Sequence, residues 1–381
     1  MATNKEQNKL NVPHLRFPEF HGEWEKHGLS EYLDFKNGLN PDSKRFGKGI
    51  KFISVMDILN NPVITYDCIR ASVQATDAEI SSFSVEKGDI LFQRSSETLE
   101  DVGRANVYID DRVAVFGGFV IRGKKKANYN PLFFRYLLSS PYARKRIIPM
   151  GAGAQHFNIG QEGLSKVLLN FPSIEEQTKI ASLLHLLDER IATQSKLIEK
   201  LESLIKGIAQ KIVRNNMPNV RLTECLECKS STLQESEVCE QGTYPVYGAN
   251  GIVGYLDNYS TEGEAVYIIK DGSGVGTVSY VTGKCSATGT LNTLQAKEGY
   301  SLQYFYYLLK VFNFEPYKTG MAIPHIYFKD YGKAKVFCPS YTEQLQYARL
   351  LSAIESNLSI EINIQTNLSL QKQYLLRQMF I

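Results

Sequence analysis

Two short stretches of the sequence, PSIEEQ at 172–177 and PSYTEQ at 339–344, repeat the same proline, serine, glutamate and glutamine 167 residues apart. In each stretch the serine can accept a hydrogen bond from a backbone amide of a starting helix. The glutamate three residues later can reach back to the serine, which completes a capping box. The proline before the serine separates the helix from the preceding segment. Each stretch therefore predicts the first turn of a helix.

The residues that follow each stretch carry an apolar seam with the spacing of a coiled coil. Apolar residues alternate four and three positions apart over 180–212, with an interruption at Gln194. The second seam, over 347–379, keeps this register but is more polar in its middle, where Glu361 takes the position of Gln194. The pattern predicts two helices of about 40 residues, each about 60 Å long. The seams alone leave open whether these helices pair with each other or with partner proteins.

The segments between the two helices also repeat, more weakly. In both, strands and turns precede a strand–turn–strand unit, a short helix with an aromatic face and a small-residue loop with a histidine. These elements are expected at 48–58, 87–109, 130–142 and 151–159, and again at 242–256, 262–281, 301–313 and 320–328. The order predicts an α+β protein in which two mixed α/β domains, related by an internal repeat, alternate with two long helices. The predicted segments are 1–172, 173–218, 219–339 and 340–381.

Composition narrows the class of protein. The 381 residues are 43% hydrophobic and 22% charged, which is typical of a soluble protein with two or three domains. No apolar run reaches the roughly 18–20 residues of a membrane span, and residues 1–17 are polar, so we expect a cytoplasmic protein without membrane contact. Cys225 and Cys228 have the spacing of half a zinc site, but no second pair follows. We therefore expect reduced thiols and no metal site.

Charge is distributed unevenly along the chain. Segment 1–172 has a net charge of +4, whereas segment 219–339 has a net charge of −2. The whole chain carries +3, which by itself indicates no particular partner. Any contact with nucleic acid must therefore come from local basic patches.

With this order of segments the chain resembles the DNA-specificity subunit of type I restriction-modification systems, over essentially its whole length. The resemblance rests on the two globular segments, each followed by Pro-Ser-x-x-Glu-Gln and a long heptad helix. RFPEFHGEWEKHGLSEYL at 16–33 and GDILF at 88–92 support it. It implies two target-recognition domains, each reading one half of an interrupted double-stranded DNA sequence. It also implies that the two helices form an antiparallel coiled coil, which sets the distance between the domains and docks two methyltransferase subunits.

The resemblance further implies that this chain has no catalysis and binds no cofactor. Partner subunits would methylate adenine with S-adenosylmethionine, and restriction subunits of the same assembly would translocate and cut DNA with ATP and Mg. In the sequence itself, DGSGVG at 271–276 lacks the Gly-Lys-Ser/Thr end of a phosphate loop, and VFGGF at 115–119 is no cofactor fingerprint. An Asn-Pro-Pro-aromatic motif for adenine methylation is also missing.

Two other functions stay open at this point. One is a two-domain coiled-coil adaptor that binds proteins but no DNA, which the negative charge of 219–339 favours. The other is an enzyme whose site has no recognisable motif. Binding to duplex DNA that weakens steeply with salt would separate a DNA-reading subunit from an adaptor.

Polar and basic residues on the predicted loops are the candidates for DNA contact, because bases are read by short polar side chains and phosphates are held by Lys and Arg. In the first domain they are Lys44, Arg45, Lys48, Arg94, Ser95, Ser96, Glu97, Thr98, Gln155, His156 and Asn158, with Arg144, Lys145 and Arg146 as further phosphate contacts. In the second domain they are Tyr247, Asn250, Lys270, Asp271, Ser273, His325 and Lys329. The helix caps and the partner interface are assigned to Ser173, Glu176, Gln177, Ser340, Glu343 and Gln344. The sequence leaves open whether Gln177 and Gln344 serve only the start of their helices or also face a partner subunit, and we expect a partner contact.

Overall fold

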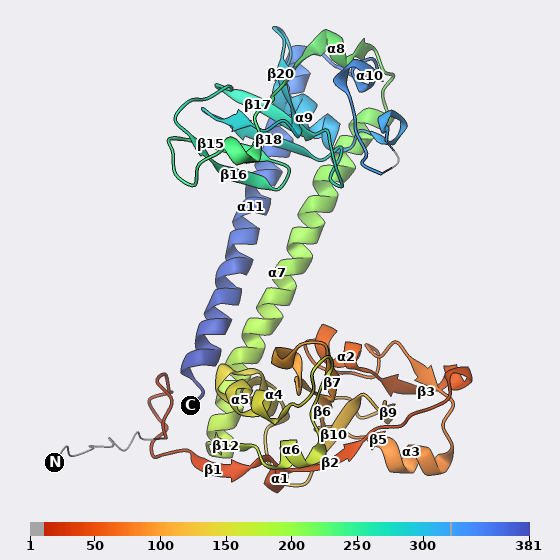
Figure 1. Cartoon of the computed structure of the whole chain (residues 1–381), viewed down its shortest axis with the longest axis vertical. Coiled ribbons are helices and arrows are strands. Elements are labelled where there is room, and N and C mark those ends of the chain that lie inside the picture. The colour runs from red at the N-terminus through yellow and green to blue at the C-terminus, as the bar shows by residue number, and fades with distance from the viewer. Residues whose placement is uncertain (1–10, 321) are drawn as a thin grey trace, which may run out of the picture. The chain divides into compact units, whose positions relative to one another are not determined.

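The computed structural model of the chain describes residues 11–320 and 322–381 (Figure 1). The first ten residues of the polar N-terminal segment and Met321 in the second histidine loop lie outside the described residues. The chain divides into two compact units, the first containing the described residues up to Thr193 with Gln365–Ile381, and the second Gln194–Ile364. Two long helices, α7 (Ile174–Arg214) and α11 (Tyr341–Gln378), each contribute to both units. The compact units therefore differ in membership from the four predicted segments, since each contains a domain and part of both helices.

The domain of the first unit is built on two four-stranded sheets. The antiparallel sheet has the order β2 (Leu33–Asn37), β10 (Val120–Lys125), β6 (Ile90–Gln93) and β8 (Ala105–Val107). The mixed sheet has the order β4 (Ser72–Val73), β3 (Phe46–Ile53), β9 (Ala114–Phe116) and β5 (Ser84–Val85), with β3 and β9 parallel. Two further antiparallel pairs are β1 (Glu25–Gly28) with β12 (Leu168–Phe171), and β7 (Ser95–Ser96) with β11 (Phe157–Asn158). The helices are α1 (Leu29–Tyr32), α2 (Val55–Asn60), α3 (Asp77–Phe83), α4 (Pro131–Ser139), α5 (Pro141–Ile147) and α6 (Gln161–Ser165).

The domain of the second unit repeats this plan. Its antiparallel sheet has the order β14 (Leu226–Ser230), β20 (Leu291–Ala296), β17 (Glu264–Ile269) and β18 (Val278–Thr282). Its mixed sheet has the order β16 (Gly251–Leu256), β15 (Tyr244–Gly248) and β19 (Ser286–Ala287), with β15 and β19 parallel. The pair β13 (Val220–Arg221) with β21 (Lys335–Val336) corresponds to β1 with β12, and α8 (Leu222–Cys225), α9 (Leu302–Lys310) and α10 (Phe328–Tyr331) correspond to α1, α4 and α6. The predicted internal repeat of two mixed domains is confirmed.

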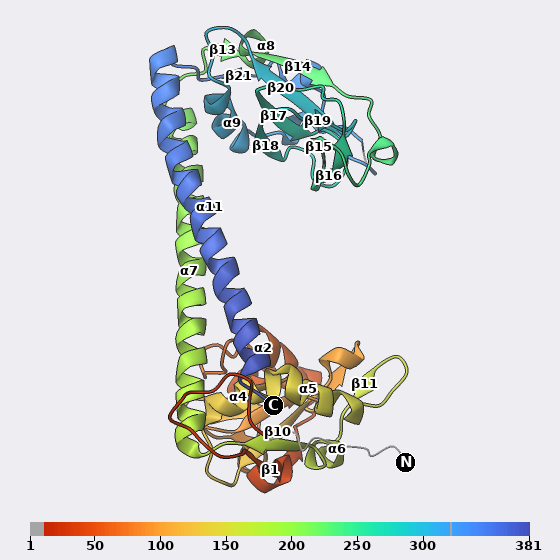
Figure 2. The same ribbon diagram turned by 90° about the vertical axis from the view of Figure 1, so that its left-hand side faces the viewer.

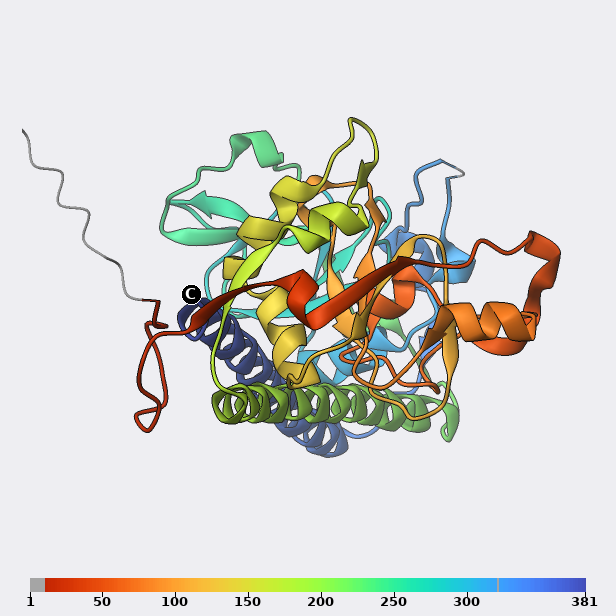
Figure 3. The same ribbon diagram turned by 90° about the horizontal axis from the view of Figure 1, so that it is seen from below.

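The short aromatic helix of each domain joins the sheet to the long helices. In the first unit α4 buries Phe133, Phe134 and Leu137 in one core with residues of α7 and α11. In the second unit α9 buries Phe305 and Tyr307 in an equivalent core. In Figure 3 the red chain of β1, α1 and β2 crosses the face of the first unit turned to the viewer, and the green α7 lies along one side. The predicted amphipathic helices thus place their aromatic faces against the coiled coil.

The seam pairs the two long helices with each other in an antiparallel direction, which answers the question that the sequence left open. In the first unit Asp188 of α7 forms an ion pair with Lys372 of α11. In the second unit Gln194 donates from Nε2 to the backbone oxygen of Glu361 (3.1 Å) and to its carboxylate. The two residues that interrupt the seam at the same repeat position therefore meet. The contact therefore joins α7 and α11 at the point where both seams are polar. Figure 2 shows the two helices running side by side.

The two predicted capping boxes differ in the structure. At α11 the box is complete: Glu343 N donates to Ser340 Oγ (3.4 Å), and Ser340 N donates to Glu343 Oε2 (3.1 Å). At α7 only half of it forms, with Glu176 N donating to Ser173 Oγ (3.3 Å). The Glu176 carboxylate is instead buried against Arg16, which donates to both of its oxygens at 2.8 and 2.7 Å. The predicted cap role of the Glu176 side chain is therefore wrong, because its carboxylate binds Arg16 of the N-terminal segment instead.

A half-buried carboxylate of α7 receives hydrogen bonds from α4. The Asp188 carboxylate accepts from the Tyr136 hydroxyl (2.8 Å) and from Arg135 Nη1 (3.2 Å), in addition to Lys372. Burial alone would raise the pKa of Asp188, but the hydrogen bonds and charge of Lys372 and its other partners hold it below its ordinary value. This carboxylate therefore ties three helices of the first unit together.

Glu355 of α11 is the equivalent carboxylate in the second unit. It accepts hydrogen bonds from the hydroxyls of Tyr306 (2.8 Å) and Tyr307 (2.7 Å) and from Lys310 Nζ (3.0 Å), all on α9. Burial again acts to raise the pKa of Glu355, and the hydrogen bonds from Tyr307, Lys310 and Tyr306 outweigh it, so the pKa lies below its ordinary value. Neither Asp188 nor Glu355 was singled out from the sequence, because an isolated acidic residue in a heptad pattern resembles a solvated surface residue.

The lowered pKa of Glu355 predicts a loss of stability in acid. A carboxyl whose pKa is lower in the folded state stabilises that state above the unfolded pKa, here ordinarily 4.5, and this contribution disappears as the pH falls through the folded value. We expect Glu355→Gln to lower the free energy of unfolding by about 1 kcal/mol at pH 7, since a hydrogen-bonded charge is lost. The variant and the original chain should converge below pH 4.5, as measured by urea unfolding across this range. An unchanged difference at all pH values would contradict the assignment.

Candidate nucleic-acid interface

Two predicted DNA-contact loops of the first domain meet at the end of its central strand β6. The Ser95 hydroxyl donates to Oδ1 of Asn158, and Ile159 N donates to the carbonyl oxygen of Arg94 (2.9 Å). These contacts join β7 to β11 across 63 residues of sequence. Figure 2 shows the chain before β11 projecting from the body of the domain. The structure therefore brings the segments 94–98 and 155–158 together at the surface of the domain, and we call this arrangement the first loop joint.

The second domain builds the same joint at the end of β17. His325 Nδ1 and Asp271 Oδ1 are 2.6 Å apart, and Ile326 N donates to the carbonyl oxygen of Lys270 (2.9 Å). Lys270 and Asp271 follow β17 as Arg94 and Ser95 follow β6, so Asp271 with His325 takes the place of Ser95 with Asn158. We call this the second loop joint. The two domains therefore keep the same backbone contact and differ in the polar side chains placed there.

Most side chains around the two joints are available to a ligand. Exposed positions are Glu97, Thr98, Gln155, His156 and Asn158 at the first joint, and Asn250, Ser273 and Lys329 in the second domain. Together they offer hydroxyl, amide, imidazole, carboxylate and ammonium groups. These groups are the donors and acceptors that can read base edges in the major groove or hold phosphates. Their contact with DNA stays a prediction.

Other predicted contacts are already engaged within their domain. Ser96 is buried and accepts a hydrogen bond from Thr98 N (3.3 Å). Tyr247 packs against Tyr267 with ring centroids 5.6 Å apart, and burial raises the pKa of Tyr247. Arg94 donates from Nη1 to the carbonyl oxygen of Gly118 (3.2 Å). These three side chains shape the surface more than they extend from it.

The three predicted phosphate contacts near β3 divide into two classes. Arg45 donates to both carboxylate oxygens of Glu79, and its Nε also donates to the backbone oxygen of Gln74 (2.8 Å). The hydrogen bond from Arg45, helped by one from Thr76 N, lowers the pKa of Glu79 to about 2. Arg45 thus fixes α3 to β3. The side chains of Lys44 and Lys48 are exposed and form no ion pair within the described residues.

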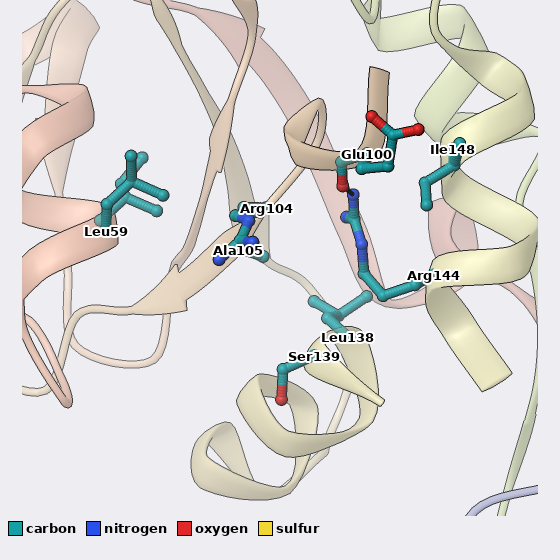
Figure 4. Close-up of a pocket in the computed structure, with 9 residues that line it drawn as sticks. Leu59, Glu100, Arg104, Ala105, Leu138, Ser139, Arg144 and Ile148 are labelled. Carbon is teal, nitrogen blue, oxygen red and sulfur yellow. Dashed lines mark hydrogen bonds between the residues drawn. The ribbon is translucent and has the colours of Figure 1, made fainter. Parts of the chain in front are cut away.

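The structure corrects the prediction for Arg144, which is half-buried and turned into the first domain. Its Nη2 donates to the carbonyl oxygens of Glu100 (2.8 Å) and Val102 (2.7 Å). Figure 4 shows its guanidinium at a cavity of about 290 Å³ that Arg104 also lines. Burial lowers the pKa of Arg144 to about 10, so it remains charged at neutral pH. Arg144 therefore braces the turn before β8, while the two basic residues that follow it are exposed.

Gln177 and Gln344 serve the starts of their own helices and also hold the short helices α4 and α9. Both side chains are buried, with exposed fractions of 3% and 2%. Oε1 of Gln177 accepts from Asn130 N (3.1 Å) at the start of α4, and Oε1 of Gln344 accepts from Ser301 N (2.9 Å) at the start of α9. Each Nε2 donates back to the proline before its own helix, at 3.0 and 2.9 Å. The expected partner contact is therefore corrected, because neither amide reaches the surface.

Three exposed apolar residues beside the first loop joint were missed by the sequence analysis. Phe119 in the β9–β10 turn has an exposed fraction of 69%, Met56 on α2 60%, and Phe46 on β3 42%. The only signal in the sequence was the VFGGF run, which places a large aromatic residue directly after two glycines in a turn. Phe46, Met56 and Phe119 line one pocket, and a contiguous exposed apolar patch of this kind is typical of a binding surface.

The sequence also led to predictions about metal ions and membranes. Within the described residues, no group of three or more His, Cys, Asp or Glu side chains has a geometry that could hold a metal ion. In the same part of the chain, every helix is too short or too polar to cross a bilayer.

The sequence matches a family model twice. The model describes the type I restriction modification DNA specificity domain, and it matches residues 21–203 and 215–370. Among curated proteins, this chain is 25% identical to a type I specificity subunit of Mycoplasma genitalium over 272 residues, which are 65% of this chain and 70% of that protein. It is 25% identical to the type I restriction enzyme MjaX specificity subunit of Methanocaldococcus jannaschii over 55% of this chain and 49% of the relative. It is 27% identical to the EcoprrI specificity subunit of Escherichia coli over 31% of this chain, and the match spans only 29% of that relative.

Solved structures show the same fold. A type I restriction-modification S subunit from M. genitalium superposes with a TM-score of 0.67 at 18% identity, covering 97% of this chain and 99% of that one. A second structure, which concerns complex assembly and conformational transition of a type I system, gives a TM-score of 0.54 at 15% identity and covers 93% and 96%. Since the family model covers most of the chain in two copies and the fold agrees throughout, the chain belongs to the type I restriction-modification DNA specificity family.

Proposed function

We propose that this chain is the non-catalytic specificity subunit of a type I restriction-modification complex. In this role it reads a bipartite, interrupted sequence in double-stranded DNA and docks two methyltransferase subunits in the cytoplasm. Methylation with S-adenosylmethionine, and any translocation or cleavage with ATP and Mg, belong to partner subunits. One observation carries the proposal: two domains of one plan present the same loop joint with different polar pairs, Ser95 with Asn158 and Asp271 with His325.

Local charge supports contact of the first domain with the duplex. Lys44 precedes β3 of the mixed sheet and Lys48 lies on it, both exposed, and Lys145 and Arg146 are exposed on α5. Phosphates are gripped by such flexible cations, whereas base edges are read by the shorter side chains of the loop joints. The second domain has a net charge of −2, so it should depend on partner subunits to hold the DNA.

Apolar side chains that remain exposed on the long helices support docking of a protein partner. In the first unit Leu186 of α7 has an exposed fraction of 63%, and Leu370 of α11 57%. In the second unit Leu204 of α7 and Leu350 of α11 are exposed by 48% and 50%. Several exposed leucines on helices that already bury a seam fit an interface that forms on assembly.

The test is DNA binding by this chain in complex with its methyltransferase subunits. We expect the logarithm of affinity for duplexes with the recognised sequence to fall linearly with the logarithm of salt concentration, because phosphate contacts release counterions. Reversing charge with Lys44→Glu and Lys48→Glu should reduce this slope by about two and weaken binding to all sequences alike. Methylation profiling of cells with and without the chain should show one interrupted motif that depends on it. A complex without salt-dependent duplex binding would instead support a protein adaptor.

A further inference from the structure

The first domain has an apolar pocket that adjoins the first loop joint. It has a volume of about 540 Å³ and is lined by Phe46, Phe52, Met56, Phe119 and Val120, with Ser95 at its edge. The rings of Phe46 and Phe52 pack edge to face, 5.1 Å apart. Because Ser95 also donates to Asn158, the polar joint and the apolar pocket share one border.

The backbone fixes the tip of the pocket to the loop joint. Arg94 N donates to the carbonyl oxygen of Phe119 (2.9 Å), and the Arg94 guanidinium donates to that of Gly118 (3.2 Å). Phe119 is nevertheless the most exposed of the large apolar residues around the pocket, at 69%. The backbone at Phe119 is therefore held at a defined place, while its side chain is exposed.

The second domain has a polar residue at the equivalent place. Lys270 N donates to the carbonyl oxygen of Thr290 (2.9 Å), as Arg94 N does to that of Phe119, and β20 begins after Thr290 as β10 begins after Phe119. The hydroxyls of Thr290 and Thr288 are 2.8 Å apart. Both domains thus keep the same backbone hydrogen bond, but the first has the exposed aromatic side chain of Phe119 where the second has the hydroxyl of Thr290.

We infer that this pocket, centred on Phe119, recognises the 5-methyl groups of thymine in the half-site read by the first domain. The inference rests on the proposed function. The thymine methyl is the apolar group that the standard base pairs display in the major groove, where the other groups are hydrogen-bond donors and acceptors. Lys44 and Lys48, which form no ion pair in the part of the chain that the structure describes, flank Phe46 in sequence. They add positive charge beside the apolar surface, which suits a duplex better than an apolar protein segment. The first half-site therefore contains at least one A·T pair that is read through its methyl group.

Replacing thymine by deoxyuridine tests this directly, because the exchange removes one methyl and leaves the base pairing intact. In the assembled complex we expect deoxyuridine at one or more thymine positions of a single half-site to weaken binding. The affinity should fall about fourfold for each methyl group removed. Phe119→Thr, which installs the residue of the second domain, should abolish that difference between thymine and deoxyuridine. Val113→Thr, at an exposed apolar residue before β9, is the matched control and should retain it.

The outcomes separate the inference from the proposed function. A complex that binds no duplex in a sequence-specific manner would overturn the proposed function and the inference with it. If the complex binds its sequence specifically but deoxyuridine has no effect, or has an effect that Phe119→Thr does not abolish, the inference is overturned and the proposed function stands. An altered methylation motif in one half-site with Phe119→Thr, and an unchanged second half-site, would support it in cells.

Discussion

Lengthening both long helices by one heptad is expected to change the spacer of the recognised DNA sequence and to leave both half-sites unchanged. The register of the coiled coil gives the design, because Gln194 lies opposite Glu361. A duplication of residues 195–201 in α7 and of the facing residues 354–360 in α11 keeps the seam continuous. Seven residues add about 10.5 Å to each helix, which corresponds to about three base pairs along the duplex.

The physical reason is the separation of roles within the chain. The loop joints lie in the two domains, whereas the duplicated residues lie only in the helices, so base recognition should be unaffected. Methylation profiling would measure both halves of the motif and the number of bases between them. Insertion into α7 alone is the informative control, since it shifts the seam by a heptad against an unchanged α11 and should lower stability. An unchanged spacer with the double insertion, in a folded complex, would contradict the role of the helices as a spacer.

The helices and the repeat could be predicted because their signals are local and periodic. The seam over 180–212 and its copy depend only on which residues are apolar, and burial of one face follows from that pattern. The pairing of the helices with each other could not be predicted in this way. It depends on contacts such as Gln194 with Glu361, whose residues were visible as interruptions but not as partners.

Identical motifs gave different structures where a distant segment intervenes. Glu176 and Glu343 occupy the same place in Pro-Ser-x-x-Glu-Gln, but Arg16 lies 160 residues from Glu176 and takes its carboxylate. In the second unit Glu343 completes its capping box. Residue type at fixed spacing cannot reveal a partner so far away in sequence. A motif therefore shows which side chains can form hydrogen bonds, but not which partners they bind.

The candidate site shows the same limit. The loops around Ser95 and Asn158 were chosen separately for their polar residues, and the β7–β11 pairing brings them together. Phe119 was overlooked because a large apolar residue is ordinarily buried, and exposure cannot be read from its letter. Its neighbours in the pocket come from β3 and α2, more than 60 residues earlier in the sequence.

The second large effect is expected at the two buried glutamines. Gln177→Leu removes the acceptor of Asn130 N and the donor to Pro172, and Gln344→Leu does the same for Ser301 N and Pro339. Each unpaired buried group costs about 1–3 kcal/mol. We therefore expect each substitution to lower the free energy of unfolding of its unit by about 2–5 kcal/mol, measured by chemical denaturation.

Stability and partner binding distinguish this structural role from a partner contact at the same residues. Gln373→Leu is the matched control, because Gln373 is exposed on α11 and its loss should change the free energy of unfolding by less than about 0.5 kcal/mol. At a temperature where the variants are folded, Gln177→Leu and Gln344→Leu should bind methyltransferase subunits with unchanged affinity. If either variant kept its stability and lost methyltransferase binding, the glutamine would be a partner contact. Burial inside its own domain argues for the opposite result, since a side chain exposed by 3% or less cannot reach another subunit unless the start of the helix rearranges.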